Sequence, residues 1–202
     1  MKDYWKADEY WKQHVHRKLE EDIWLDDYCS ELPPSGKALD LGCGIGQFSR
    51  VLMGYGYTVT SADISDIALA EVRRFQPQTV KLDMREPLPF ADETFQLVFA
   101  NLSIHYLSDA ETKTLISEIK RILAPGGMFV GSVNSMRGFE YIRETAQELE
   151  HHYYWNTDRY LRFFDEADLR SYLSPFASCR VEARETVRFE NPKNYLAFLC
   201  GK

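Results

Sequence analysis

Residues 37–50 of the chain read KALDLGCGIGQFSR, and they place three glycines within five positions directly after a short apolar run. Each glycine costs backbone entropy on folding, so the use of Gly42, Gly44 and Gly46 indicates a loop that brings its backbone close to another group. The loop follows a predicted strand and leads into a predicted helix. In open α/β sheets such a turn lies at the carboxyl edge of the sheet, where ligands bind. A tight turn without a ligand is the alternative.

The length and charge of the chain indicate one acidic globular domain. Its 202 residues suffice for a single domain with a sizeable core, which we assign to residues 1–202, with residues 1–33 as an N-terminal helical extension. The formal net charge of -7 disfavours a nucleic-acid partner. The N-terminus lacks an apolar secretion signal, and no apolar run reaches the roughly 18 residues of a membrane span. We therefore expect a cytoplasmic protein without a membrane partner, as a monomer or homodimer.

The cysteine spacing predicts neither disulfides nor a metal site. Cys29, Cys43, Cys179 and Cys200 show no paired spacing of the redox or metal-binding type. We therefore expect reduced thiols. Acidic residues at 109 and 111 are close together, but they are better placed to favour the N-terminus of the helix that follows. No bound metal is expected.

Strand and helix patterns alternate through the middle of the chain, which indicates a parallel sheet covered on both faces. Ser65 or Asp66 provides a good helix cap. The predicted strands cover 37–42, 57–64, 79–84, 94–101 and 128–134, and the predicted helices cover 46–56, 65–76 and 111–124.

The N-terminal segment has the pattern of a single helix. Trp11, Val15, Leu19 and Ile23 recur at about one helical turn, which predicts one amphipathic helix over residues 5–30. Its aromatic side chains either pack onto the domain or cover a site.

The C-terminal third predicts helices over 140–155 and 165–173, then a hairpin formed by 179–189 and 194–201. The expected fold is α/β, with a Rossmann-like, doubly wound, mostly parallel sheet and an antiparallel C-terminal hairpin strand.

Two ligand classes suit the glycine loop: a dinucleotide, and a nucleoside cofactor that has no pyrophosphate. Asp63, at the end of the second predicted strand, would accept hydrogen bonds from ribose hydroxyls in either class. A dinucleotide fingerprint, G-x-G-x-x-G, would need a glycine at Gln47. Asp40 precedes the first glycine by two residues, where a carboxylate is poorly suited to pyrophosphate but compatible with a cationic ammonium or sulfonium group.

Four segments, in the expected order, resemble class I S-adenosylmethionine-dependent methyltransferases, including small bacterial proteins with this domain. LDLGCGIGQFS at 39–49 resembles the first motif, and ADIS at 62–65 supplies the second-strand acid. KLDMREPLPFADETFQLVFANLSIHYL at 81–107 resembles the third and fourth strands, and RILAPGGMF at 121–129 the turn into the fifth. The resemblance covers about residues 36–133 at the level of motifs.

The resemblance implies S-adenosyl-L-methionine as the cofactor. Asp63 would bind the ribose hydroxyls, and Asp83 with the Met84 backbone would bind the adenine. Asn101 would offer its backbone carbonyl or amide to the methionine moiety. Without the resemblance, Asp83 would be interpreted as a carboxylate that caps a helix or lies in a loop. The implied cofactor-binding residues are Asp40, Gly42, Cys43, Gly44, Gly46, Asp63, Ile64, Asp83, Met84 and Asn101.

Methyl transfer from a sulfonium depends mainly on alignment, because the cofactor carries the activation. A general base is needed only for an acceptor that is protonated at working pH. His105 is a candidate base or substrate anchor, because its reference pKa lies near neutrality. Tyr106 is the second candidate. Packing against the following helix is the alternative for both.

The segment HHYYWNTDRYLRFF at 151–164 follows the fifth predicted strand, where this fold commonly carries substrate-binding insertions. His151, Tyr154, Arg159 and Arg162 are candidates for an aromatic and cationic pocket, and arginine suits a carboxylate or oxyanion. An edge strand with one buried face explains the same pattern.

We predict an S-adenosylmethionine-dependent methyltransferase that acts on a small-molecule acceptor. Pro-Pro-Tyr after the fourth strand and a Pro-Cys nucleophile, which DNA-modifying relatives use, are both missing from the sequence. The alternatives are a protein or peptide methyltransferase, a non-catalytic cofactor-binding regulatory module and a nucleotide-dependent oxidoreductase.

Overall fold

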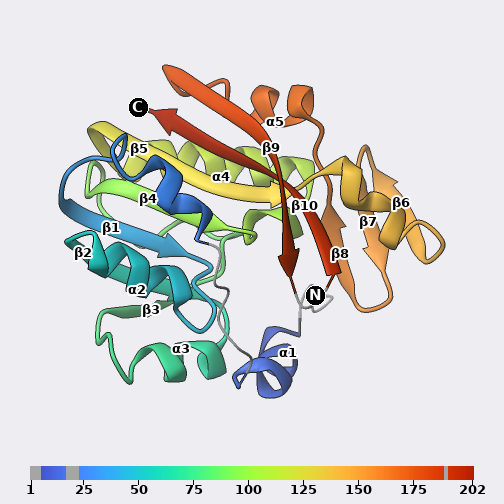
Figure 1. The fold of residues 1–202 in the computed structure, drawn as a ribbon, viewed down its shortest axis with the longest axis horizontal. Helices are drawn as coiled ribbons and strands as arrows, with labels where there is room; N and C mark the ends of the chain where they lie inside the picture. The colour runs from blue at the N-terminus through green and yellow to red at the C-terminus, as the bar shows by residue number, and fades with distance from the viewer. Residues whose placement is uncertain (1–5, 17–22, 189–190) are drawn as a thin grey trace.

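The computed structural model describes residues 6–16, 23–188 and 191–202. Its strands form two sheets (Figure 1). The strands are β1 Gly36–Leu41, β2 Tyr57–Asp63, β3 Thr79–Lys81, β4 Phe95–Asn101, β5 Leu123–Asn134, β6 Ala146–Glu150, β7 Tyr153–Asn156, β8 Arg159–Arg162, β9 Ser178–Arg188 and β10 Asn191–Gly201. The α-helices are α1 Ala7–His14, α2 Gln47–Gly54, α3 Asp66–Val72, α4 Asp109–Ile122 and α5 Glu166–Leu173, and the 3-10 helices are η1 Trp24–Tyr28, η2 Ile104–Tyr106 and η3 Met136–Tyr141.

The larger sheet has the strand order β3-β2-β1-β4-β5-β10-β9. Strands β1 to β5 run parallel, whereas β10 pairs antiparallel with both β5 and β9. The order reverses between β1 and β4, which is the switch point where open α/β sheets bind ligands. The predicted Rossmann-like sheet with antiparallel C-terminal strands is confirmed.

Both faces of the larger sheet are buried, because neighbouring residues of one strand enter different cores. Leu39 of β1 packs into a cluster that contains Ile116 of α4, whereas Ala38 packs into a cluster that contains Phe48 of α2. A strand buried on both faces is mostly apolar, which explains the sequence FQLVFAN of β4, where Gln96 and Asn101 are only half-buried.

Helices α3 and α4 begin at side-chain caps that the sequence encodes. Ser65 accepts a hydrogen bond from the amide of Ala68 at the start of α3, which confirms one of the two predicted caps. Ser108 and Glu111 form a reciprocal capping box at the start of α4. The acidic residue at 111 therefore has the helix-starting role that the sequence indicated.

The predicted single helix over residues 5–30 is wrong. Within the described residues, α1 ends at His14, and the short helix η1 begins only at Trp24; Leu19 lies outside them. Trp24 is buried on the sheet, and its ring stacks on Phe99 at 5.8 Å. Packing therefore accounts for the aromatic side chain of η1.

The predicted helix over 140–155 is also wrong. After η3, the strands β6, β7 and β8 form a separate antiparallel sheet, which we call the insertion sheet. The glutamates at 144, 148 and 150 favoured a helix in the sequence, but Tyr153 and Tyr154 are buried and pair across to β8. Tertiary burial of these aromatic residues outweighs helix propensity.

The expectation of four reduced thiols is wrong for one pair. Cys179 and Cys200 form a disulfide between β9 and β10. They lie directly opposite one another in the hairpin register, with Cα atoms 4.2 Å apart. Their spacing of 21 residues carries no signal until that register is known. Cys29 and Cys43 are free, exposed and buried respectively.

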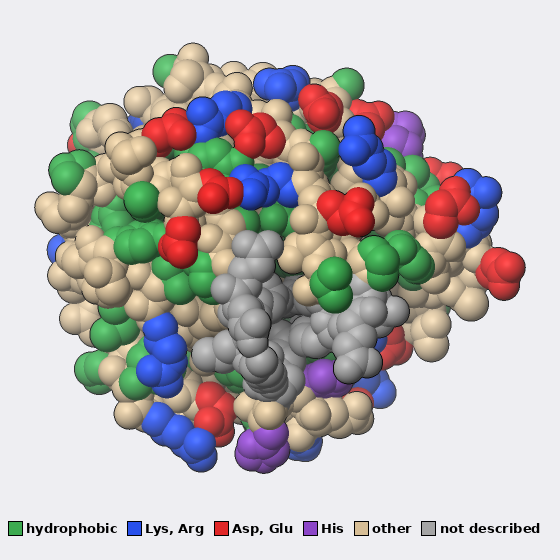
Figure 2. Space-filling model, in the orientation of Figure 1, with side chains coloured by type: hydrophobic (Ala, Val, Ile, Leu, Met, Phe, Trp, Pro, Cys, Tyr) green, Lys and Arg blue, Asp and Glu red, His purple; other side chains and the backbone are tan. Residues whose placement is uncertain are grey.

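The surface shown in Figure 2 interleaves basic and acidic side chains, without a broad basic patch. None of the helices in the described ranges is both long enough and apolar enough to cross a membrane.

Candidate functional site

The glycine loop between β1 and α2 is tied to the end of β2. The amides of Gly42 and Cys43 both donate to the carbonyl of Ala62, at 2.8 and 2.9 Å. The amide of Gly44 donates to the carboxylate of Asp63 at 2.8 Å. The loop therefore lies at the carboxyl edge of two adjacent parallel strands, where the sheet topology favours a ligand.

The glycines of this loop are required by the protein's own packing. Gly42 has φ 78°, and a Cβ there would lie 2.3 Å from the Cβ of Ser103. Gly44 has φ 54°, and a Cβ there would lie 2.6 Å from the ring of Trp11. Gly46 also has a positive φ, of 81°. The close approach that the sequence indicated is thus in part an approach to this chain's own side chains.

Asp63 is held in place by backbone amides. Its two carboxylate oxygens accept hydrogen bonds from Gly44 and Ser65, at 2.8 and 2.9 Å. Burial raises the pKa of Asp63, although hydrogen bonds from the amides of Ser65, Gly44 and Ile64 oppose the shift. A carboxylate has about four lone-pair positions, so Asp63 retains acceptor capacity for a ligand.

A second acid, Asp40, lies beneath the loop in β1. It is buried and accepts a hydrogen bond from the hydroxyl of Ser49 at 2.6 Å, and that hydroxyl also lies 2.7 Å from the hydroxyl of Ser61. Burial raises the pKa of Asp40 to about 7, and the nearby charge of Asp63 adds to the rise. In the described ranges, no lysine or arginine forms an ion pair with either acid. The pair therefore creates a negative potential that suits a cationic ligand.

Asp83 and Met84 lie at the turn that follows β3. Burial raises the pKa of Asp83, but hydrogen bonds from Arg85 outweigh that effect and leave the pKa below its usual value. The Nε of Arg85 lies 2.9 Å from both carboxylate oxygens. The Cε of Met84 lies 2.8 Å from the position of a Cβ on Gly42, so Met84 contacts the glycine loop. An adenine at Asp83 would share that carboxylate with Arg85.

The side chains of Asn101 and Cys43 serve the fold. The Oδ1 of Asn101 accepts hydrogen bonds from Nε1 of Trp24 at 3.0 Å and from the hydroxyl of Ser132 at 2.6 Å. The side chain of Asn101 is therefore engaged within the protein, and the contact that the resemblance implies would involve its backbone. Cys43 packs against Leu69 and other apolar residues of α3, and burial raises the pKa of its thiol well above the usual value.

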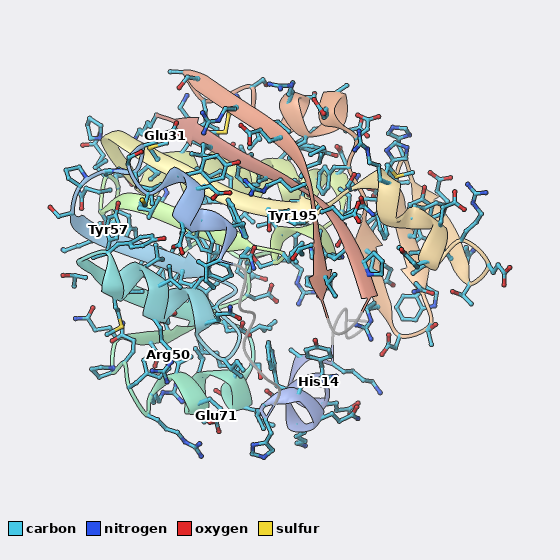
Figure 3. The ribbon with its side chains drawn as sticks, in the orientation of Figure 1. His14, Glu31, Arg50, Tyr57, Glu71 and Tyr195 are labelled. Carbon is cyan, nitrogen blue, oxygen red and sulfur yellow. A yellow bond between two sulfur atoms is a disulfide. The ribbon has the colours of Figure 1, made fainter. Side chains whose placement is uncertain are left out.

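Helix α1 packs over the glycine loop and against α3 (Figures 1 and 3). The carboxylate of Asp8 accepts hydrogen bonds from the hydroxyl of Ser65 at 2.5 Å and from the amide of Ile67 at 3.3 Å. Trp11 lies over Gly44. The N-terminal segment is thereby fastened to the same turn that fixes Asp63.

A cavity of about 510 Å³ opens beyond the carboxyl ends of β4 and β5. Its volume lies in the range of small-molecule sites. Three of the candidate residues named from the sequence, His105, Tyr106 and Arg159, line it. The complete lining is Leu102, His105, Tyr106, Asn134, Gly138, Tyr141, Ile142, Asn156, Thr157, Asp158, Arg159, Leu161, Phe163, Pro192, Lys193 and Asn194.

The other three predicted substrate residues lie outside this lining. Tyr154 is buried, with its ring 4.5 Å from that of Phe139. His151 is mostly exposed and faces Asp168. Arg162 is buried.

Arg162 connects the insertion sheet to the segment after η2. Its guanidinium donates to the carbonyl of Leu107 at 3.1 Å, to the carbonyl of His151 at 3.0 Å and to the carboxylate of Glu150 at 2.9 Å. The hydroxyl of Tyr153 donates to the carbonyl of Tyr106 at 3.2 Å. Arg162 is thus a positioning residue, which holds the cavity wall formed by η2.

Sequence reasoning missed the contribution of β10 and the end of β5. Lys193 lines the cavity and donates a hydrogen bond to Oδ1 of Asn134. The side-chain amide of Asn134 lies 3.5 Å from the carbonyl of Arg162. The sequence placed Lys193 in a hairpin turn, but only the strand register shows that it faces the cavity.

Residues 39–131 match the family model of a methyltransferase domain. An uncharacterized methyltransferase of Synechocystis sp. is 36% identical over 99 residues, which cover 48% of this chain and 47% of that protein. A malonyl-[acyl-carrier protein] O-methyltransferase of Erwinia billingiae is 31% identical over 120 residues, which cover 56% of this chain and 45% of that protein. The chain thus spans about half the length of both curated relatives.

Among solved structures, a methyltransferase of Burkholderia thailandensis shares the fold. That 1,6-didemethyltoxoflavin-N1-methyltransferase, with bound 1,6-didemethyltoxoflavin and S-adenosylhomocysteine, has a TM-score of 0.66 at 21% identity. The match covers 90% of this chain and 81% of that chain. At this identity, the likeness shows the fold.

Replacing Arg162 with methionine should destabilise the protein by about 2–4 kcal/mol, because the carbonyls of Leu107 and His151 lose their donor. Arg159→Met is the matched control on the same strand. Arg159 pairs with Asp158 near the surface, so its loss should cost less than about 1 kcal/mol. Urea unfolding measures both variants. Equal free energies of unfolding for both would contradict the positioning role of Arg162.

Proposed function

We propose that this chain, whose residues 39–131 match a methyltransferase domain, is a class I S-adenosylmethionine-dependent methyltransferase that transfers a methyl group to a small-molecule acceptor. The observation that carries the proposal is the Asp63 carboxylate, which the glycine loop holds at the carboxyl end of β2, one strand from the switch point of the sheet. This carboxylate and the loop amides provide the donors and acceptors that a nucleoside with an amino-acid tail requires.

The residues around the loop fit the cofactor. Asp63 accepts the ribose hydroxyls, and Asp40 stabilises the positive charge of the methionine end. Met84 covers the adenine beside Asp83. S-adenosylmethionine supplies, when bound, a methyl group already activated on a sulfonium. The chain then has to hold the cofactor, exclude water and align the acceptor.

The cavity beyond β4 and β5 is the proposed acceptor site. Its volume of about 510 Å³ admits a small molecule, and its lining combines aromatic walls with amide and cationic groups. Arg159 and Lys193 favour an acceptor that carries a carboxylate or another oxyanion. His105 and Tyr106 lie at the wall nearest β4, where they would anchor the acceptor or receive its proton.

A carrier-bound acid is the second candidate acceptor. The Erwinia relative is named for a malonyl group on an acyl-carrier protein, which combines a small carboxylate with a protein carrier. The cationic lining of the cavity is compatible with such a group. A non-catalytic regulatory module would bind the cofactor without turning over any acceptor.

Calorimetric titration with S-adenosylhomocysteine tests the cofactor assignment. We expect micromolar binding, and no binding of NAD in a parallel titration. Asp63→Ala should weaken binding by roughly 1.5–3 kcal/mol, the scale of hydrogen bonds to a charged group. Asp66→Ala, in a nearby exposed ion pair with Lys81, should leave binding unchanged. Unchanged affinity in a folded Asp63→Ala variant would contradict the ribose role, and binding of NAD alone would contradict the proposed function.

Release of S-adenosylhomocysteine from S-adenosylmethionine tests the acceptor. The panel contains small carboxylates, phenols, amines and thiols, with peptides and a malonyl-loaded acyl-carrier protein as separate arms. We expect turnover of a small acid. Leu161→Trp fills part of the cavity and should raise the KM of that acid at least tenfold without changing cofactor affinity. Turnover of peptides alone, or an unchanged KM in the variant, would contradict the assignment of the cavity.

The raised pKa of Asp40 predicts a pH dependence of cofactor binding. Because that pKa is about 7 and a sulfonium cation prefers the ionised acid, S-adenosylmethionine should bind about tenfold more tightly at pH 8 than at pH 6, with proton release. In the unbound protein, the raised pKa of Asp40 has the opposite effect on folding: the free energy of unfolding falls as pH rises from about 4 towards 7. Calorimetry in buffers of different ionisation enthalpy measures the released protons. Asp40→Asn should abolish the dependence, and a dependence that persists in this variant would assign it to another group.

A further inference from the structure

Two histidines and a carboxylate form a cluster outside the cofactor and acceptor sites. His151 and His152 form the turn between β6 and β7, and Asp168 lies in the first turn of α5. The Nδ1 of His152 lies 2.6 Å from Oδ2 of Asp168, and Nε2 of His151 lies 3.4 Å from the same oxygen. One ligand atom from each residue lies within 4.8 Å of the other two.

The two elements that carry the cluster are fixed independently of each other. The amide of His152 donates to the carboxylate of Glu148 at 3.0 Å, which closes the turn. The amide of Asp168 donates to Asp165, the N-cap of α5, at 2.8 Å. The rings of His151 and His152 lie together, with centroids 3.8 Å apart. The cluster therefore has one ligand fixed on the core and two on the insertion sheet.

The geometry points to a divalent transition-metal site, and we propose that His151, His152 and Asp168 bind one Zn²⁺ ion. Zinc binds histidine nitrogen and carboxylate oxygen at about 2.0–2.2 Å, so tetrahedral ligand atoms lie about 3.3–3.5 Å apart. The His151–Asp168 separation meets that requirement, and the shorter His152–Asp168 contact opens by less than 1 Å. The side chain of His151 is 72% exposed, so its ring can turn towards the ion. Water completes the coordination.

The ligand atoms of this cluster, two imidazole nitrogens and one carboxylate oxygen, favour some cations over others. Imidazole suits zinc, nickel and copper, whereas magnesium and calcium require oxygen ligands. Two imidazoles with a single carboxylate therefore favour zinc over magnesium. No metal-ligand spacing is visible in the sequence, because Asp168 lies 16 residues from His152 and meets it only through tertiary packing.

A metal at this cluster would link the insertion sheet to α5. The insertion sheet and its β7–β8 turn contribute Asn156, Arg159 and Leu161 to the cavity wall. Zinc would therefore stabilise that wall from its outer side, without contact with the reacting groups. The site does not depend on the proposed methyl transfer.

Calorimetric titration of the tag-free, chelator-treated full chain with Zn²⁺ tests the proposal. The experiment uses a Cys29→Ser background, because Cys29 is an exposed free thiol that could bind zinc. We expect one equivalent of zinc and no heat from Mg²⁺. His151→Gln and Asp168→Asn should each weaken zinc binding at least tenfold. His14→Gln, which changes a histidine on α1, is the matched control and should leave zinc binding unchanged.

Thermal unfolding tests the same site without relying on heats of binding. Zinc at about one hundred times its dissociation constant should raise the Tm by several degrees, and His151→Gln should remove the rise. His151 is exposed, so its replacement should preserve the fold. Absence of zinc binding, equal binding of Mg²⁺, or zinc affinity and Tm shifts unaffected by His151→Gln and Asp168→Asn would each overturn the proposal.

Discussion

The hydrogen bond from the amide of Gly44 to the carboxylate of Asp63 is the contact on which the site depends. It joins the loop after β1 to the end of β2 and orients the acid at the carboxyl edge of the sheet, one strand from the switch point. The surrounding contacts reinforce that placement. The amide of Ser65 fixes the other oxygen of Asp63, and the hydroxyl of Ser65 binds both the start of α3 and Asp8 of α1. One short turn thus fixes a helix, an N-terminal segment and a charged group.

The cavity depends on a different constraint, the attachment of the insertion sheet to the core. Arg162 binds the carbonyls of Leu107 and His151, and it contacts the ring of Tyr153 at 4.9 Å. The large polar surface of an arginine is retained in a buried position because its fork of donors satisfies carbonyls from two chain segments. The exposed turn before β8 can therefore vary next to Arg159, while Arg162 anchors the other end of the same strand.

The sequence predicted the parallel half of the fold well because its signals are local. Apolar runs, glycine turns and the Ser65 cap are each contained within a few residues, and the structure confirms them. The errors have non-local causes. The insertion strands acquire their β structure from aromatic burial, and the Cys179–Cys200 pair exists only in the hairpin register. For the same reason, the sequence did not distinguish Arg159, which lines the cavity, from Arg162, which is buried three residues later.

The two acids beneath the glycine loop are costly for the fold itself. Asp40 and Asp63 are both buried, and burial raises the pKa of each carboxyl, which means that ionisation is unfavourable in the unbound protein. Asparagine at these positions would retain an acceptor oxygen without the cost of a buried charge. Hydroxyl and amide donors offset part of that cost, but in the described ranges no cationic side chain does. A bound cation would supply the missing charge, so the same pair of carboxylates that weakens the empty fold would strengthen its complex with a sulfonium or ammonium ligand. Local instability and ligand preference then have a single electrostatic origin.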